Sequence, residues 1–170
     1  MTMSRSMRLL PIVLFSLLWS GASLVAQSGE MSVLQNLPAV GVVVRGLSSD
    51  GAKLGLTESE LIAAVREPLE AAGVRIIPPP MLERTPEAPL LEISANVSQS
   101  GRTSYFYILD LQLREPVKPP RVNRTLVTVP AVTWAQQKGG VTANPENVGA
   151  ALAQLAQRFA DEWTEARRAQ

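Results

Sequence analysis

Carboxylates are the side chains best suited to chemistry in this chain. It has no histidine and no cysteine, which removes Ser-His-Asp and Cys-His nucleophile sites, thiol redox chemistry and the usual zinc and haem ligand sets. Glu92 and Asp110 can share one face of a hairpin, where paired acids can hydrolyse glycosides. Ordinary charges on a solvated strand explain the same residues more simply. We therefore predict no catalytic, cofactor-binding or metal-binding residue and no cofactor.

Three large apolar residues offer a second kind of candidate site. Trp134, Phe106 and Ile108 lie in segments with the alternation of strands. Residues of this type belong to a core more often than to a site. We therefore expect them to pack, with helices over one face of the sheet and a connector over the other. An exposed apolar binding surface is the alternative.

Residues 1–26 have the layout of a secretory signal peptide. Arg5 and Arg8 supply a positive start, residues 9–19 are apolar and uncharged, and small residues lead to Ala26. The apolar part is about a dozen residues long, whereas a helix needs about 20 to span a bilayer. We expect cleavage near Ala26 and a periplasmic or secreted protein. An uncleaved anchor is the alternative, and a lipid-modified cysteine is excluded.

The remaining chain has nearly balanced charge. The sequence has 16 Lys and Arg against 15 Asp and Glu, and the arginines of the signal segment account for the basic excess. A near-neutral domain without a basic block has no electrostatic footprint for nucleic acid or anionic lipid. We expect no nucleic-acid partner and no stable membrane insertion after cleavage, and without disulfides the fold must rest on packing.

A strand and a capped helix are predicted to open the domain. Residues 39–46 are rich in valine and end at a turn cluster at 48–51. Thr57 and Glu60 then form a capping box, in which each side chain bonds a backbone N–H of the other residue. An amphipathic helix is predicted from this box onward.

Two residues bear on how this helix continues and ends. Gly73 is well placed as its terminal glycine. Pro68 lies before that end and should kink the helix or divide it in two, because proline lacks an N–H and crowds the preceding turn. A short strand is predicted at 74–77, followed by a rigid proline connector beginning at Pro78.

Two segments of alternating apolar and polar residues predict an antiparallel hairpin: residues 91–97 and 105–114. Like charges would meet if Glu92 faced Asp110 directly. A register shifted by two residues places Glu92 opposite Gln112 and diagonal to Arg114. We predict this second register.

A third antiparallel strand is predicted at 125–134, where Pro130 favours an edge position or a bulge. A loop containing Gly139-Gly140 is expected next. Asn144 as the N-cap and Pro145 at the first helical position then predict the start of the closing helix. An apolar stripe follows along one face of this helix: Val148, Leu152, Leu155, Phe159 and Trp163.

These elements follow the order β-α-β-β-β-β-α. We predict a flexible lead-in at 27–37 and a single α+β domain at 38–168. Its sheet is expected to be mixed or antiparallel, with about four to five strands and two helices packed on one face.

The chain resembles a group of uncharacterised exported bacterial proteins in several places: Gly55-Leu56-Thr57, Ala72-Gly73-Val74, the Leu91–Val97 strand, Thr133-Trp134, and Phe159 in the closing helix. More distantly it is similar to small α/β domains of envelope accessory proteins, such as the amino-terminal domain of the Tol-system propeller protein. The resemblance covers residues 38–165 and implies an architecture. It carries no catalytic motif, so no functional residue is transferred.

Three hypotheses about function follow. The first is a non-catalytic periplasmic domain, not an enzyme, that acts through contact with a protein partner in the cell envelope. The second is a carrier of a small apolar ligand held between the sheet and the helices. The third is a hydrolase that uses carboxylates alone, with Asp110 and Glu92 as its only candidates.

Overall fold

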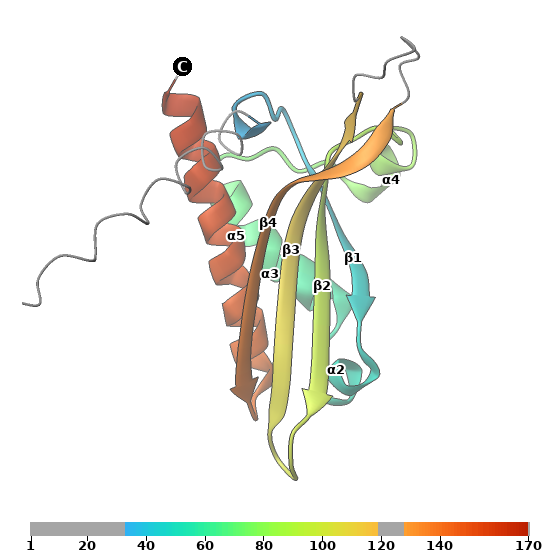
Figure 1. Ribbon diagram of the computed structural model, residues 1–170, viewed down its shortest axis with the longest axis vertical. Coiled ribbons are helices and arrows are strands. Elements are labelled where there is room, and N and C mark those ends of the chain that lie inside the picture. The colour runs from blue at the N-terminus through green and yellow to red at the C-terminus, as the bar shows by residue number, and fades with distance from the viewer. Residues whose placement is uncertain (1–32, 119–127, 170) are drawn as a thin grey trace, which may run out of the picture.

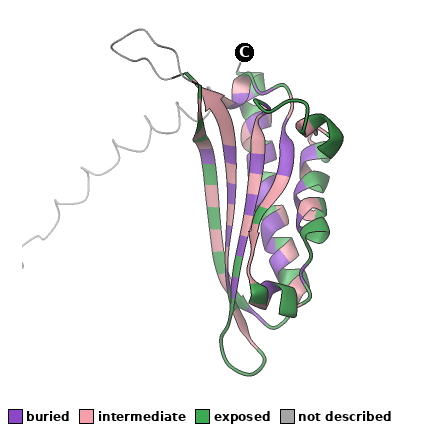
Figure 2. Cartoon of the chain, turned by 90° about the vertical axis from the view of Figure 1, so that its right-hand side faces the viewer, coloured by how far each residue is buried: buried purple, intermediate pink, exposed green. Residues whose placement is uncertain are grey.

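The computed structural model describes residues 33–118 and 128–169. They form a four-stranded sheet with two long helices against one face, as Figures 1 and 2 show. The strand order is β1-β2-β3-β4; β1 is parallel to β2, and the other neighbours are antiparallel. The elements are β1 (Gly41–Leu47), α2 (Ser49–Lys53), α3 (Glu58–Ala71), α4 (Pro79–Leu82), β2 (Leu90–Gln99), β3 (Tyr105–Val117), β4 (Val129–Thr142) and α5 (Pro145–Arg168). The predicted α+β class is confirmed.

Helix α3 begins and ends as the sequence predicts. The backbone N–H of Glu60 donates to Thr57 Oγ1, and the backbone N–H of Thr57 donates to Glu60 Oε2, so the capping box is confirmed. Gly73 follows the helix with φ +83°, a left-handed conformation that glycine adopts without a steric cost.

Helix α3 continues through Pro68 as a single helix, so the predicted division into two pieces is wrong, while the alternative of a kink stays a prediction. The proline ring removes one backbone donor and crowds the preceding turn. Val65 and Leu69, on either side of the ring, are both fully buried. Packing therefore holds both parts of the helix against the core and outweighs the local cost.

The register of the β2–β3 hairpin is the predicted one. Glu92 pairs with Gln112, and Arg114 Nε lies 3.0 Å from Glu92 Oε2. Asp110 pairs with Ser94 instead of Glu92. The two carboxylates therefore do not lie directly opposite each other.

Strand β4 continues past the predicted end at Trp134, and the expected loop at Gly139-Gly140 is part of it. The first predicted residues of this strand, 125–127, lie outside the described part. Both glycines pair with β3, Gly140 opposite Tyr107. A Cβ added to Gly140 would lie 2.5 Å from Tyr107 Oη, so the tyrosine ring would have to move if this residue were not glycine. Pro130 lies on an edge strand, as predicted.

Two short segments also differ from the predictions. The expected strand at 74–77 is reduced to one bridge, Val40 to Ile76, because the chain leaves the sheet at the prolines that follow. The expected turn at 48–51 contains the start of helix α2, whose N-cap is Ser48.

The core begins before the first strand. Leu34 and Leu37 are buried, although they fall in the expected lead-in at 27–37; the earlier residues of that lead-in lie outside the described part. Trp134 packs edge-to-face on Phe159 with ring centroids 4.9 Å apart, so the expectation that Trp134 packs is confirmed. The whole apolar stripe of α5, from Val148 to Trp163, is buried as predicted.

Candidate functional site

The sheet has one covered and one uncovered face. Odd-numbered residues of β2 from Leu91 to Val97 and of β3 from Tyr107 to Leu113 are buried against the helices, and the even-numbered residues between them point the other way. Among the described residues, no helix or connector lies over the second face, which we call the open face (Figures 1 and 2). The connector expected there from the sequence is not seen in that part of the chain.

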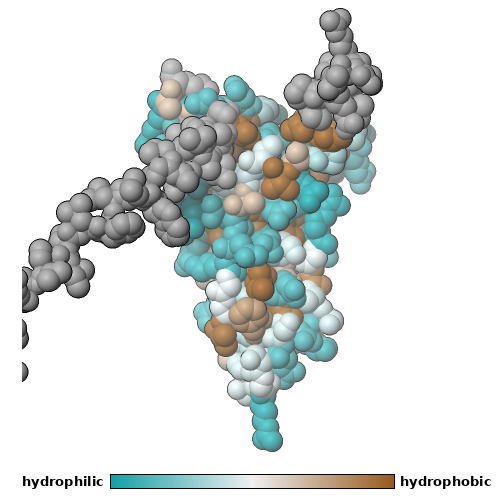
Figure 3. All heavy atoms as spheres, in the orientation of Figure 1, coloured by the Kyte–Doolittle hydropathy of each residue, from teal (hydrophilic) through white to brown (hydrophobic). Residues whose placement is uncertain are grey.

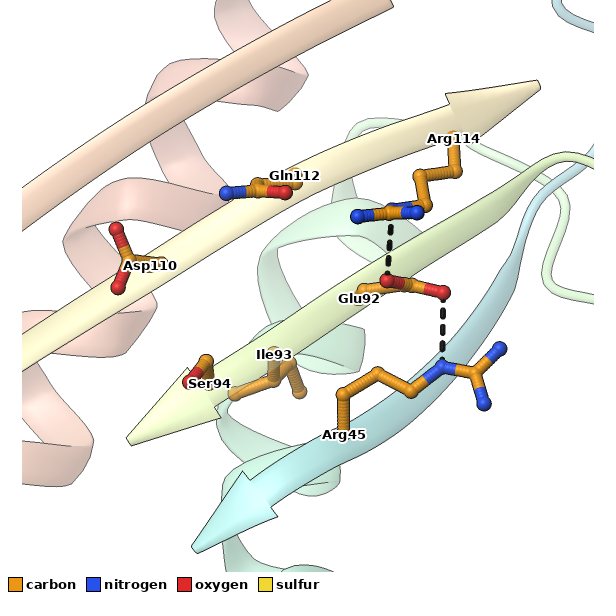
Figure 4. Close-up of a pocket in the computed structure, with 7 residues that line it drawn as sticks. All are labelled: Arg45, Glu92, Ile93, Ser94, Asp110, Gln112 and Arg114. Carbon is orange, nitrogen blue, oxygen red and sulfur yellow. Dashed lines mark hydrogen bonds and ion pairs between the residues drawn. The ribbon is translucent and has the colours of Figure 1, made fainter. Parts of the chain in front are cut away.

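An ion-paired cluster occupies the middle of the open face (Figure 4). Glu92 lies between two arginines: Arg45 Nε donates to Glu92 Oε1 at 2.8 Å, and Arg114 Nε lies 3.0 Å from Glu92 Oε2. The Arg114 contact is an ion pair without hydrogen-bond alignment. Each carboxylate oxygen of Glu92 thus contacts one guanidinium group. Only 11% of the Glu92 side chain is exposed.

The sequence indicated the Arg114 contact but not the Arg45 contact. Arg45 lies at an irregularity in β1, where the pairing with β2 shifts between Val44 and Gly46. Neither the parallel pairing of β1 with β2 nor this shift leaves a local signal in the sequence. Strand alternation alone therefore does not show that Arg45 reaches Glu92.

Asp110 lies on the same face as Glu92, as expected, but has a different partner. Its Oδ1 accepts a hydrogen bond of 2.7 Å from Gln137 Nε2 on β4. Both carboxylates line a pocket of about 210 Å³ together with Ser94 and the cluster. Each acid is already engaged by neighbouring side chains, which favours a structural arrangement over an acid–base pair aimed at a substrate.

Apolar side chains lie exposed on the same face, so the expectation that Phe106 packs is wrong. Phe106 is 43% exposed and pairs across the strands with Val141, which is 66% exposed. Ile108, half-buried, lies two residues along the face. We call these three residues the apolar patch. Val132, 46% exposed, lies nearer the other end of β4. Figure 3 shows hydrophobic spheres above and below a hydrophilic middle zone of this face.

The region between the sheet and the helices is filled by one cluster of buried side chains. The pockets lined by described residues include the one beside Glu92 and one of about 260 Å³ at the end of β1 near Ser48, and neither of these two lies between the sheet and the helices. This packing gives no support to a carrier of an apolar ligand held under the sheet.

Two further findings concern the described residues, 33–118 and 128–169. Within these ranges, acidic side chains do not gather in any group of three or more that could hold a metal ion. No helix within them is both long enough and apolar enough to cross a membrane. The predicted signal peptide and its cleavage near Ala26 lie outside the described part.

Comparison with known proteins gives structural likenesses only. No protein-family model matches the chain, and no curated protein sequence matches it. The PelC dodecamer from Paraburkholderia phytofirmans is 15% identical over 74% of this chain and 88% of that chain, with a TM-score of 0.44. A minor lipoprotein from Acinetobacter baumannii is 14% identical over 77% and 93%, with a TM-score of 0.37. Lipoprotein GNA1162 from Neisseria meningitidis is 11% identical over 73% and 99%, with a TM-score of 0.35.

These neighbours are bacterial proteins, and two of them are lipoproteins by name. With TM-scores below 0.5, the likenesses carry no argument about activity, partners or assembly. The resemblance to the amino-terminal domain of the Tol-system propeller protein stays a prediction.

Proposed function

We propose that this chain is an exported, non-catalytic domain that binds a protein partner in the bacterial cell envelope through the open face of its sheet. The observation that carries the proposal is the one-sided covering of the sheet. The helix-covered face holds the core, while Phe106 and Val141 of the apolar patch are exposed on the other face. Exposed apolar residues beside polar ones are typical of protein–protein contact surfaces.

The polar centre of the open face fits the same role. The Arg45–Glu92–Arg114 cluster is held together by its own ion pairs, so it presents guanidinium groups without a large net charge. Arginine and aromatic residues are enriched in protein interfaces, where a polar rim surrounds an apolar contact. Export rests on the predicted signal peptide at 1–26, which would place this face in the envelope.

Site-specific photo-crosslinking in cells that export the protein tests the proposal. A photoreactive amino acid at Ile108 should crosslink one recurrent envelope protein. The same group at Glu67, an exposed position on α3, is the matched control and should not capture that protein. Phe106→Ser combined with Val141→Ser should reduce the Ile108 crosslink at least about fivefold, because the apolar contact is lost.

Both serine substitutions replace exposed side chains, so the double variant should fold like the parent chain, with a stability change within about 1 kcal/mol. Equal crosslinking from Ile108 and Glu67, or no recurrent partner at Ile108, would count against the open face as the binding surface. Loss of folding in the double variant would show that the patch belongs to the core.

A further inference from the structure

Among the described residues, no strand lies beside the outer edge of β4, and this edge carries a row of backbone groups without a partner there. Both the N–H and the C=O of Val97 bond the Ser48 hydroxyl, so odd-numbered residues of β2 direct their backbone groups toward β1. Even-numbered residues of β2 therefore form backbone hydrogen bonds with the residues opposite them on β3. By the same alternation, odd-numbered residues of β3 form backbone hydrogen bonds with the even-numbered residues opposite them on β4. The remaining residues of β4 direct their N–H and C=O groups outward: Ala135, Gln137, Gly139 and Val141.

This edge has little of the protection that natural sheet edges usually have. Short strands, prolines, bulges and outward charges normally block pairing with another chain. In β4, Pro130 and the shift of pairing beside Thr133 lie near the start of the strand. Nine regularly paired residues follow, from Trp134 to Thr142. The one charged residue among them is Lys138. Its side chain is hydrogen-bonded to Gln154 of α5, so it does not hinder pairing of another strand with the edge.

Helix α5 determines what can lie beside this edge. Side chains of α5 bond to β4 at three successive places: Glu162 to Trp134, Arg158 to Gln136, and Gln154 to Lys138. In Figure 1 the C-terminal half of α5 extends past the free edge of β4. A second copy that formed an antiparallel β4–β4 pair, about a two-fold axis perpendicular to the sheet, would place its own α5 on the same face as this overhang, where the two helices would crowd each other. A single extended segment brings no second helix to that face.

We infer that β4 binds an extended segment of a partner protein as a fifth strand of the sheet, an inference that rests on the proposed function. Backbone hydrogen bonds to the four outward residues would supply the affinity. Ala135 and Gly139 have minimal side chains on the open face, which leaves room for side chains of the added strand beside the apolar patch. The segment should therefore carry apolar residues at alternate positions and no proline among its paired residues.

A displayed library of random twelve-residue peptides, selected against the protein purified from exporting cells, tests the inference. Selection should enrich peptides with alternating apolar residues. Gln137→Pro removes one outward N–H while leaving the β3 ladder intact, so it should weaken the selected peptides at least about tenfold. Gln137→Ala keeps the N–H and removes only the side chain, so it should weaken them less than about threefold.

Amide hydrogen exchange gives a readout that does not depend on the proline variant folding. Bound peptide should slow exchange at Ala135, Gln137, Gly139 and Val141, whose amides face outward. Equal binding to Gln137→Pro and Gln137→Ala, protection confined to other strands, or a selection without enriched peptides would each overturn the inference. Slow exchange at the outward amides in a dimer without peptide would overturn it in favour of a second copy.

The outcomes separate this inference from the proposed function. If Gln137→Pro folds and the envelope crosslink from Ile108 persists at full strength, strand addition is wrong while binding through the open face stands. If no position on the open face yields a recurrent crosslink, the proposed function itself fails.

Discussion

Ser48 is the residue at which three elements of the fold are joined. Its hydroxyl donates to the Val97 carbonyl at 2.7 Å and accepts from the N–H groups of Val97 at 2.8 Å and Gly51 at 3.2 Å. The side chain thus caps α2 and also occupies the place of a β1 backbone partner for β2. One small polar group continues the sheet after the strand itself has turned away.

Replacing this hydroxyl should cost more than an ordinary surface change. Ser48→Ala leaves the N–H and C=O of the buried Val97 without partners, and we expect a loss of about 1–3 kcal/mol in the free energy of unfolding. Urea denaturation measures this loss. Ser49→Ala, at the exposed neighbouring position, is the control and should change stability by less than about 0.5 kcal/mol. Similar losses in both variants would contradict the bridging role of Ser48.

Asp50 ties the same short helix to the end of β2. Its carboxylate accepts a hydrogen bond from Lys53 Nζ and another from the backbone N–H of Gln99. The Lys53 hydrogen bond, followed by the Gln99 bond, holds the pKa of Asp50 below its ordinary value. The ionised form is therefore the one that connects α2 with β2.

At the scale of elements, helix α3 shows packing prevailing over local preference. Pro68 lies three residues before the end of the helix, and its missing N–H leaves the Ala64 carbonyl without its intrahelical donor. Pro68→Ala should stabilise the protein by about 1–2 kcal/mol. This is less than the full helix-propensity difference of about 3 kcal/mol, because proline also restricts the unfolded chain.

Thermal and urea unfolding of Pro68→Ala beside Glu67→Ala measure this effect. Glu67 is the exposed preceding residue, and its substitution should be nearly neutral. A Pro68→Ala variant no more stable than the parent chain would show that the proline ring contributes packing of its own to the half-buried side of the helix.

Elements with strong local signals could be predicted from the sequence. The capping box at Thr57 and the proline after Asn144 mark helix starts by chemistry that acts within one turn. The hairpin register was predictable because one alternative placed Glu92 against Asp110, and like charges disfavour that pairing.

The sequence predictions are wrong or incomplete at residues whose local structure is determined by contacts with distant parts of the chain. Gly139-Gly140 has the composition of a loop, but both glycines pair with β3, and the Tyr107 ring lies where a side chain at Gly140 would be. Similarly, Arg45 gains its partner only through the shift in pairing between β1 and β2. In the candidate site, the sequence therefore indicated Glu92, Asp110 and Arg114 as neighbours but not the complete ion-paired cluster.

At the scale of the whole molecule, the asymmetry of the two layers connects stability with function. The large apolar side chains of α3 and α5 pack against one face of the sheet. The open face and the outer edge of β4 are the surfaces that we propose for contact with another chain. Phe106 is exposed on the open face, so we expect its substitution to weaken the proposed binding without loss of the core.

The start of the described chain belongs to the same cooperative unit as its last helix. Leu34 is fully buried, and Trp163 Nε1 on α5 donates to the Leu37 carbonyl at 3.4 Å. Leu34→Ala should therefore cost about 2–5 kcal/mol through lost burial and the cavity left behind. Asn36→Ala, at an exposed position in the same segment, should stay within about 0.5 kcal/mol of the parent chain.

Urea unfolding followed by tryptophan fluorescence and by circular dichroism tests this connection. If the segment is part of the core, Leu34→Ala should lower the midpoint of one transition that both probes report together, because the core is shared by sheet and helices. A Leu34→Ala variant as stable as Asn36→Ala would mean that the folded unit begins at β1 and that residues 33–37 only rest against it.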